Sequence, residues 1–163
     1  LKACSNLHSL SIPKRQRALE EIDVNWDEQR LTHQHMSISQ LQETHQSPWL
    51  QIAAHTVNHP SLAQLTQEEQ RSEILESKRS LEKYLDANIA GFAYPYGSPN
   101  DFSEETMSIV KSLGFSYGMA NFPSPIWKGT NNFSINRFIV RDWTADIFRQ
   151  KLESWYNCEH FSL

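Results

Sequence analysis

Apolar residues recur along the chain with two different spacings, which predict where its strands and helices lie. Continuous apolar runs, typical of strands buried on both faces, occupy residues 49–54, 89–94 and 115–119, with a shorter run at 138–140. Between these runs, apolar residues stand three or four positions apart, which is the spacing of an amphipathic helix. The alternation predicts an α/β fold with a parallel sheet and helices packed outside it.

Side chains that cap helices mark where the longest helix begins. Thr66 and Glu69 form a capping box, in which the hydroxyl bonds forward and the carboxylate reaches back. The box predicts a helix that continues to about Leu85. Its expected inner face consists of Ile74, Leu75, Leu81, Tyr84 and Leu85.

Four more helices are predicted from similar signals. Ser103 caps a helix that ends at Gly114, and Thr144 caps a last helix through about Trp155. Nearer the N-terminus, Pro13 indicates the first turn of a short helix over 13–22. Residues 37–43 predict another, capped by Ser37 or Ser39, and residues 23–36 are expected to form a loop.

Composition narrows the class of protein without naming a function. The 163 residues, with 39% hydrophobic and 21% charged residues, are typical of one globular domain. The net charge of −4 gives no electrostatic reason to expect nucleic acid or an anionic membrane as a partner. No stretch approaches the roughly 20 apolar residues that a membrane span requires. We expect Cys4 and Cys158 to be free thiols, although they would pair if the termini lay close together.

The segment His55-Thr56-Val57-Asn58-His59-Pro60 carries the strongest chemical signal. Two imidazoles four residues apart can hold one metal ion through nitrogen. Pro60 disfavours the helical conformation at His59, so the pair is predicted where a strand ends and a turn begins. Ligand sites of α/β proteins lie at such strand ends. The alternative is a pair of ordinary, partly buried histidines with backbone partners.

Other histidines and aromatic residues have a plainer interpretation. We expect His33, His35 and His45 on the solvated surface, because their surroundings are polar. Tyr94 and Tyr96 lie near a predicted strand end, where aromatic residues are often simple core residues.

Three segments together resemble polysaccharide deacetylases, the NodB-homology group or carbohydrate esterase family 4. Residues 54–60 resemble the family's second motif, His-Ser/Thr-x-x-His-Pro. Residues 92–97 read Phe-Ala-Tyr-Pro-Tyr-Gly and resemble the third motif in the form of one branch. Residues 136–143 are similar to a later segment of that branch, so the resemblance covers roughly residues 36–156.

The resemblance implies a fold and a reaction. The fold is part of a distorted (β/α) barrel with a helical N-terminal segment, in which residues 1–48 form an insertion of the same domain and residues 49–163 its C-terminal part. The reaction is metal-dependent removal of N- or O-acetyl groups from a carbohydrate. An acetylated carbohydrate is therefore the expected partner, and a divalent ion, zinc first, the expected cofactor. Family members work at the cell envelope and on intracellular precursors, so no compartment is implied.

The family's site residues carry over to positions of this sequence. His55 and His59 correspond to metal ligands, and the backbone N–H of Tyr96 to an oxyanion donor. Tyr94 and Trp143 are the substrate-binding candidates, with Trp143 as a wall of the pocket for the acetyl methyl group.

The sequence departs from the family pattern in three places. The first motif, Thr-Phe-Asp-Asp, supplies the general base and the third metal ligand, yet no Asp-Asp pair occurs here. Because position 1 is Leu, we expect that the N-terminal third of the domain is missing and that the chain alone is inactive. Ala93 stands where the third motif has Arg, so we expect Arg137, or else Arg141, to replace it. The closing Leu-x-His motif has only a poor match around His160.

Two alternatives to the deacetylase remain. One is a carbohydrate-binding or structural remnant in which the sheet and the histidine pair persist without turnover. The other is a metal hydrolase that acts on a different amide. An in-frame Asp-Asp upstream of Leu1 would favour the enzyme over the remnant.

Overall fold

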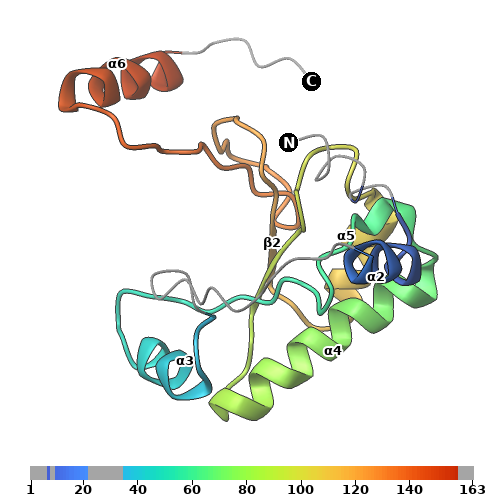
Figure 1. Ribbon diagram of the computed structural model, residues 1–163. Helices are drawn as coiled ribbons and strands as arrows, with labels where there is room; N and C mark the ends of the chain where they lie inside the picture. The colour runs from blue at the N-terminus through green and yellow to red at the C-terminus, as the bar shows by residue number, and fades with distance from the viewer. Residues whose placement is uncertain (1–6, 8–9, 22–34, 158–163) are drawn as a thin grey trace.

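The computed structural model describes residue 7 and residues 10–21 and 35–157. Within these stretches, helices and short parallel strands follow one another along the chain (Figure 1). The elements are α2 (Ile12–Glu20), α3 (Ile38–His45), the 3₁₀ turn η1 (Leu62–Gln64), α4 (Gln67–Leu85), β1 (Gly91–Ala93), α5 (Glu104–Ser112), β2 (Tyr117–Met119) and α6 (Ala145–Tyr156). The predicted helices are therefore confirmed, whereas the strands are shorter than expected.

The sheet consists of β1 and β2, which pair in parallel. Two isolated bridges extend it, because Ala54 pairs with Phe92 on one side and Ile135 pairs with Met119 on the other, both in parallel. Four segments thus lie side by side in the order in which they occur in the sequence. This arrangement confirms the expected α/β class, and the described strands do not close a barrel.

The outer two strand predictions are wrong in extent. Residues 49–54 were expected to form a buried strand, but only Ala54 joins the sheet, and Trp49 and Leu50 are 90% and 58% exposed. Likewise, no strand forms over 138–140, where Ile139 and Val140 are 53% and 59% exposed. Beyond the single bridges at Ala54 and Ile135, neither segment makes the run of ladder pairs that defines a strand.

The long helix α4 begins at the predicted capping box. The Thr66 hydroxyl accepts from the Glu69 N–H, and the Glu69 carboxylate accepts from the Thr66 N–H. Ile74 is fully buried on its inner face, but Tyr84 is 41% exposed, contrary to expectation. At 3.6 residues per turn, position 84 points about 80° away from Ile74, at the edge of the buried stripe.

Helices α4 and α5 pack against each other beside the strands, and α3 packs against α4 (Figure 1). The helix caps predicted at Ser37, Ser103 and Thr144 are all observed, with each hydroxyl accepting from a backbone N–H of its own first turn. Helix α6 has no buried residue and lies apart from the other helices (Figure 1).

The hydrophobic core lies between the strands and the pair α4 and α5. Its residues come from β1, α4 and α5 and from the segments that connect the elements: Ala54, Leu62, Ile74, Leu85, Ile89, Phe92, Tyr94, Phe102, Val110, Phe115 and Ala120. Among the residues that the structure describes, no helix is both long and apolar enough to cross a membrane. Cys4, His33, Cys158 and His160 lie outside the described residues.

Candidate functional site

A cleft of about 560 Å³ lies at the carboxyl ends of the parallel segments. His55 follows Ala54, Tyr96 follows β1, Asn121 follows β2, and Arg137 follows Ile135; all four side chains line the cleft. The geometry of a parallel sheet brings successive carboxyl ends to one edge, which explains why segments distant in sequence meet here.

The imidazole of His55 is oriented by the main chain of the neighbouring strand. Its Nδ1 lies 2.7 Å from the carbonyl oxygen of Ala93, at the end of β1. Because a carbonyl oxygen only accepts, Nδ1 carries the proton of this hydrogen bond. In the neutral ring, Nε2 then has a free lone pair, which is the tautomer that binds a metal ion.

His59 lies against His55 in a tightly turned loop. The two ring centroids are 4.7 Å apart and the planes are inclined by 76°. Thr56 and His59 both have positive φ, 62° and 52°, and the His59 N–H donates to the Thr56 hydroxyl at 3.0 Å. Non-glycine residues in this conformation are uncommon and often mark functional loops.

Tyr96 occupies the centre of a second tight turn in the same cleft. Its φ is 59°, and the Gly97 N–H donates to the Pro95 carbonyl oxygen at 2.6 Å, which closes a three-residue turn. The Tyr96 ring lies 4.7 Å from the His59 ring. Asn121 holds the turn from the next segment, because its side chain donates to the Tyr96 carbonyl oxygen at 3.1 Å.

Arg137 reaches the same cleft from the last parallel segment. Its Nε donates to the carbonyl oxygen of Ala120 at 2.8 Å, which fixes the guanidinium at the end of β2. Arg141, the second candidate, is exposed, and the cleft lining does not include it. The structure thus brings Arg137 to the histidines, while the part it plays there stays a prediction.

The two substrate-binding candidates have different surroundings. Tyr94 is 1% exposed, its ring stacks on Phe102 with centroids 4.0 Å apart, and its hydroxyl donates to the Phe133 carbonyl oxygen at 2.8 Å. Burial raises the pKa of the Tyr94 phenol, so the hydroxyl remains a donor. Tyr94 supports the Pro95–Tyr96 turn, and a direct contact with substrate stays a prediction.

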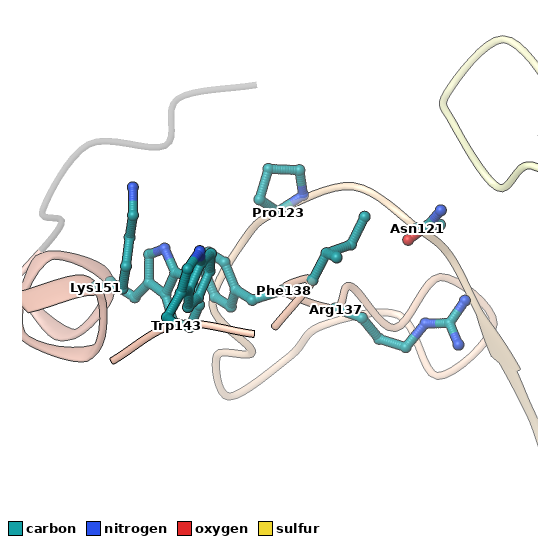
Figure 2. A pocket seen from close by; sticks show the side chains of 8 residues that line it. Asn121, Pro123, Arg137, Phe138, Trp143 and Lys151 are labelled. Atoms are coloured by element: carbon teal, nitrogen blue, oxygen red, sulfur yellow. The ribbon is translucent and has the colours of Figure 1, made fainter. Parts of the chain in front are cut away.

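Trp143 lies in an adjoining pocket of about 240 Å³. Figure 2 shows it beside Lys151 of α6, with Phe138 next to it and Arg137 extending on the other side toward Asn121. The two hollows share Asn121, Arg137 and Phe138 in their linings. Trp143 is therefore a neighbour of the histidine cleft and not part of its immediate wall.

Three residues that the sequence did not indicate bind the site loops: Arg15, Glu73 and Asn121. A signal for Glu73 existed, because Gln70, Glu73 and Ser77 form a polar stripe at helical spacing next to Ile74 on the buried face of α4. Arg15 and Asn121 lie in segments without such a pattern.

The imidazoles of His55 and His59 are suited to act as two ligands of a metal ion. Two adjacent imidazoles, one with its tautomer fixed, have the donor atoms that zinc and similar ions prefer. Across the part of the chain that the structure describes, however, no group of three or more His, Cys, Asp or Glu side chains lies close enough to hold an ion.

Comparison with known proteins identifies the family. Residues 22–118 match the model of the polysaccharide deacetylase family. The chain belongs to the polysaccharide deacetylase family. Members of this family are hydrolases that act on acetylated carbohydrates, and the family is generally metal-dependent.

Individual deacetylases are similar to this chain in sequence and in structure. YxkH of Bacillus subtilis (strain 168), whose name classes it as a polysaccharide deacetylase, is 26% identical over 106 residues, which are 65% of this chain and 37% of YxkH. The Streptococcus pyogenes deacetylase PplD, solved in complex with acetate, has a TM-score of 0.64 and 27% identity over 71% of this chain and 50% of that chain. BC0361, a polysaccharide deacetylase from Bacillus cereus, has a TM-score of 0.62 and 22% identity over 72% of this chain and 36% of its own.

The solved deacetylases confirm the fold class as part of a NodB-type α/β fold with helices. The chain matches about half or less of the length of each of these proteins.

Proposed function

We propose that this chain carries the two-histidine part and the oxyanion-binding part of a carbohydrate deacetylase active site, in the branch of the family with the Phe-Ala-Tyr-Pro-Tyr-Gly motif. The observation that carries the proposal is the juxtaposition of His55 and His59 in the cleft, with the His55 tautomer fixed by Ala93. A pair of buried structural histidines would not need an exposed cleft or a loop with two positive φ angles.

In this proposal, His55 and His59 hold a divalent ion, zinc first by ligand type. When bound, the ion supplies Lewis-acid polarisation of the acyl carbonyl and makes water a stronger acid. The backbone N–H of Tyr96 donates to the oxygen that becomes negatively charged, and the Pro95–Gly97 turn fixes the backbone of this residue, whose ring lies against His59. Arg137, fixed on Ala120, orients the general base.

The proposed substrate is a carbohydrate with an N- or O-linked acetyl group. Family membership supports this class, and PplD, with which the chain shares its fold, is a deacetylase that was solved with acetate. The adjoining pocket with Trp143 provides an apolar wall next to Arg137, which suits an acetyl methyl group.

We also propose that these 163 residues alone release no acetate. The sequence holds no Asp-Asp pair, and the described residues supply no third ligand beside the two histidines. The contact of Arg15 with the His59 loop supports the interpretation of residues 1–48 as part of the same domain as residues 49–163.

Metal binding tests the histidine assignment directly. We expect Zn²⁺, titrated by calorimetry, to bind the chain, and His55→Ala and His59→Ala each to weaken binding about tenfold or more, because each removes one ligand. His35→Ala is the matched control, because His35 is exposed and distant in sequence from the cleft. Equal Zn²⁺ affinity in all four proteins would reject the ligand assignment.

Acetate release tests the reaction. If the gene encodes an Asp-Asp motif upstream of these residues, its whole product is expected to release acetate from at least one acetylated glycan in a panel, whereas the 163-residue chain is not. Metal binding without release from any glycan would favour the carbohydrate-binding remnant or a hydrolase of another amide.

A further inference from the structure

The loop that carries His59 is bound along one edge by a carboxylate of α4. The backbone N–H groups of Val57 and Asn58 both donate to Oε2 of Glu73, at 3.0 and 2.9 Å. The side-chain amide of Asn58 donates to Oε1 of the same residue at 2.6 Å. Both carboxylate oxygens of Glu73 therefore accept hydrogen bonds from the segment between the two histidines.

Glu73 is a buried residue, so these hydrogen bonds are not a surface contact. Its side chain is only 8% exposed and adjoins the fully buried Ile74 on the inner face of α4. A carboxylate is costly to bury unless hydrogen bonds replace its water. Here the replacement comes from two successive backbone N–H groups that follow Thr56 at positive φ, an arrangement of amides that forms an anion-binding concavity.

The opposite edge of the same loop is bound by a cation from α2. The Arg15 guanidinium donates to the carbonyl oxygen of His59 at 3.0 Å and also to the carbonyl oxygen of Asn58. The N–H side of the loop thus faces a carboxylate while its C=O side faces a guanidinium. The two charged groups come from helices that are far apart in the sequence.

We propose that Glu73 and Arg15 are positioning residues for His59. By binding the 57–59 backbone from its two edges, they hold the His59 ring against His55, so that both nitrogens are placed for one ion before it arrives. The inference rests on the proposed role of the two histidines as metal ligands. It adds a pair of residues that act on the metal only through the conformation of the loop.

A reciprocal exchange between Glu73 and Asn58 tests the pair. In Glu73→Gln, the new amide NH₂ faces the NH₂ of Asn58, and a hydrogen bond between them forms only if the Asn58 amide turns over to present its oxygen. In Asn58→Asp, two carboxylates face each other. The double variant Asn58→Asp/Glu73→Gln restores a donor and an acceptor with the roles reversed, and the glutamine oxygen still accepts the two backbone N–H groups.

Two measurements are made on these variants. The first, without metal, is amide hydrogen exchange at positions 57 and 58 by NMR; each single variant is expected to accelerate it about tenfold, and the double variant to restore it. The second is the dissociation constant for Zn²⁺ by calorimetry, expected to rise 10- to 100-fold in each single variant, the range typical of residues that orient ligands, and to return in the double variant.

Matched controls separate this effect from general destabilisation. Glu76→Gln removes an exposed carboxylate one turn further along the same helix and should change neither measurement. Arg15→Gln should weaken Zn²⁺ binding, whereas Arg17→Gln, exposed on the same helix, should not. Circular dichroism confirms that each variant is folded under the conditions used.

The outcomes distinguish this inference from the proposed function. Faster exchange with unchanged Zn²⁺ affinity would show that Glu73 only stabilises the loop, which overturns the positioning role. Single variants that behave like wild type in both measurements would overturn it as well. If wild type itself binds no Zn²⁺, the assignment of His55 and His59 as metal ligands fails. Restored amide exchange in the double variant would in that case still show that Glu73 and Asn58 stabilise the backbone of residues 57–59.

Discussion

Gly118 shows how a single residue position determines the shape of the site. A Cβ atom at this position of β2 would lie 2.6 Å from the hydroxyl oxygen of Tyr94 and 3.0 Å from the carbonyl oxygen of Phe133. These two oxygens form the hydrogen bond that anchors Tyr94 below the Pro95–Tyr96 turn. The missing side chain of Gly118 therefore provides the space for the group that supports the proposed oxyanion donor.

A double-mutant cycle at this position has a defined expected result. Gly118→Ala is expected to lower the free energy of unfolding by about 1–3 kcal/mol through overpacking, and Tyr94→Phe by about 0.5–1.5 kcal/mol through loss of its hydrogen bond. The double variant should cost less than the sum, because removal of the hydroxyl relieves the contact with the new Cβ. Urea denaturation measures all three, and strict additivity would show that Gly118 and Tyr94 act independently.

Among the secondary-structure elements, helices α3, α4, α5 and α6 each begin at a side chain that caps the first turn. The capping box of α4 is the clearest case, because the Thr66 and Glu69 side chains satisfy each other's backbone N–H groups. The backbone N–H of Thr66, followed by its hydroxyl, lowers the pKa of Glu69 below the usual value of 4.5. A carboxyl whose pKa is lower in the folded state stabilises that state above its ordinary pKa, and the stabilisation disappears as pH falls through the folded pKa.

The variant Glu69→Gln tests this electrostatic contribution to α4. Wild type should be more stable than Glu69→Gln at pH 7, and the difference in unfolding free energy should shrink as the pH falls below about 4.5. Glu68→Gln, which removes a charge from the same first turn but no capping bond, is the control. A difference that stays constant from pH 7 to pH 3 would contradict a role for ionised Glu69.

At the scale of the whole molecule, stability is distributed unevenly. Helix α4 buries six of its residues against the strands and α5, whereas α6 buries none and carries exposed apolar side chains such as Ile147 and Leu152. The connection from β2 to α6 contains little regular structure beyond the bridge at Ile135 (Figure 1). Local opening is therefore expected to cost least at the C-terminal end of the described chain.

Hydrogen exchange followed by mass spectrometry checks this distribution. Backbone amides of Ala145–Tyr156 should exchange well before those of Gln67–Leu85, because α6 has no buried residue and packs mainly through Trp155 against Phe138. Equal protection of the two helices in the 163-residue chain would show that α6 is stabilised by interactions that its exposed surface does not reveal.

Features that depend on near neighbours in the chain can be predicted from the sequence alone. The caps at Ser37, Thr66, Ser103 and Thr144 fixed where helices begin, because a capping bond spans three residues. The motifs around His59 and Tyr96 likewise indicated the two turns of the site, since Pro60 follows His59, Pro95 precedes Tyr96, and a proline restricts the backbone locally.

Features that join distant segments depend on tertiary contacts and could not be predicted from local patterns. Apolar runs at 49–54 and 138–140 looked like strands, but apart from the single bridge at Ala54 neither run pairs with a described strand. The hydrogen bonds of Glu73 and Arg15 to the His59 loop and of Asn121 to Tyr96 span 15 to 44 positions. No local pattern encodes such contacts, because they form only when the parallel strands bring their carboxyl ends together and the helices pack beside them.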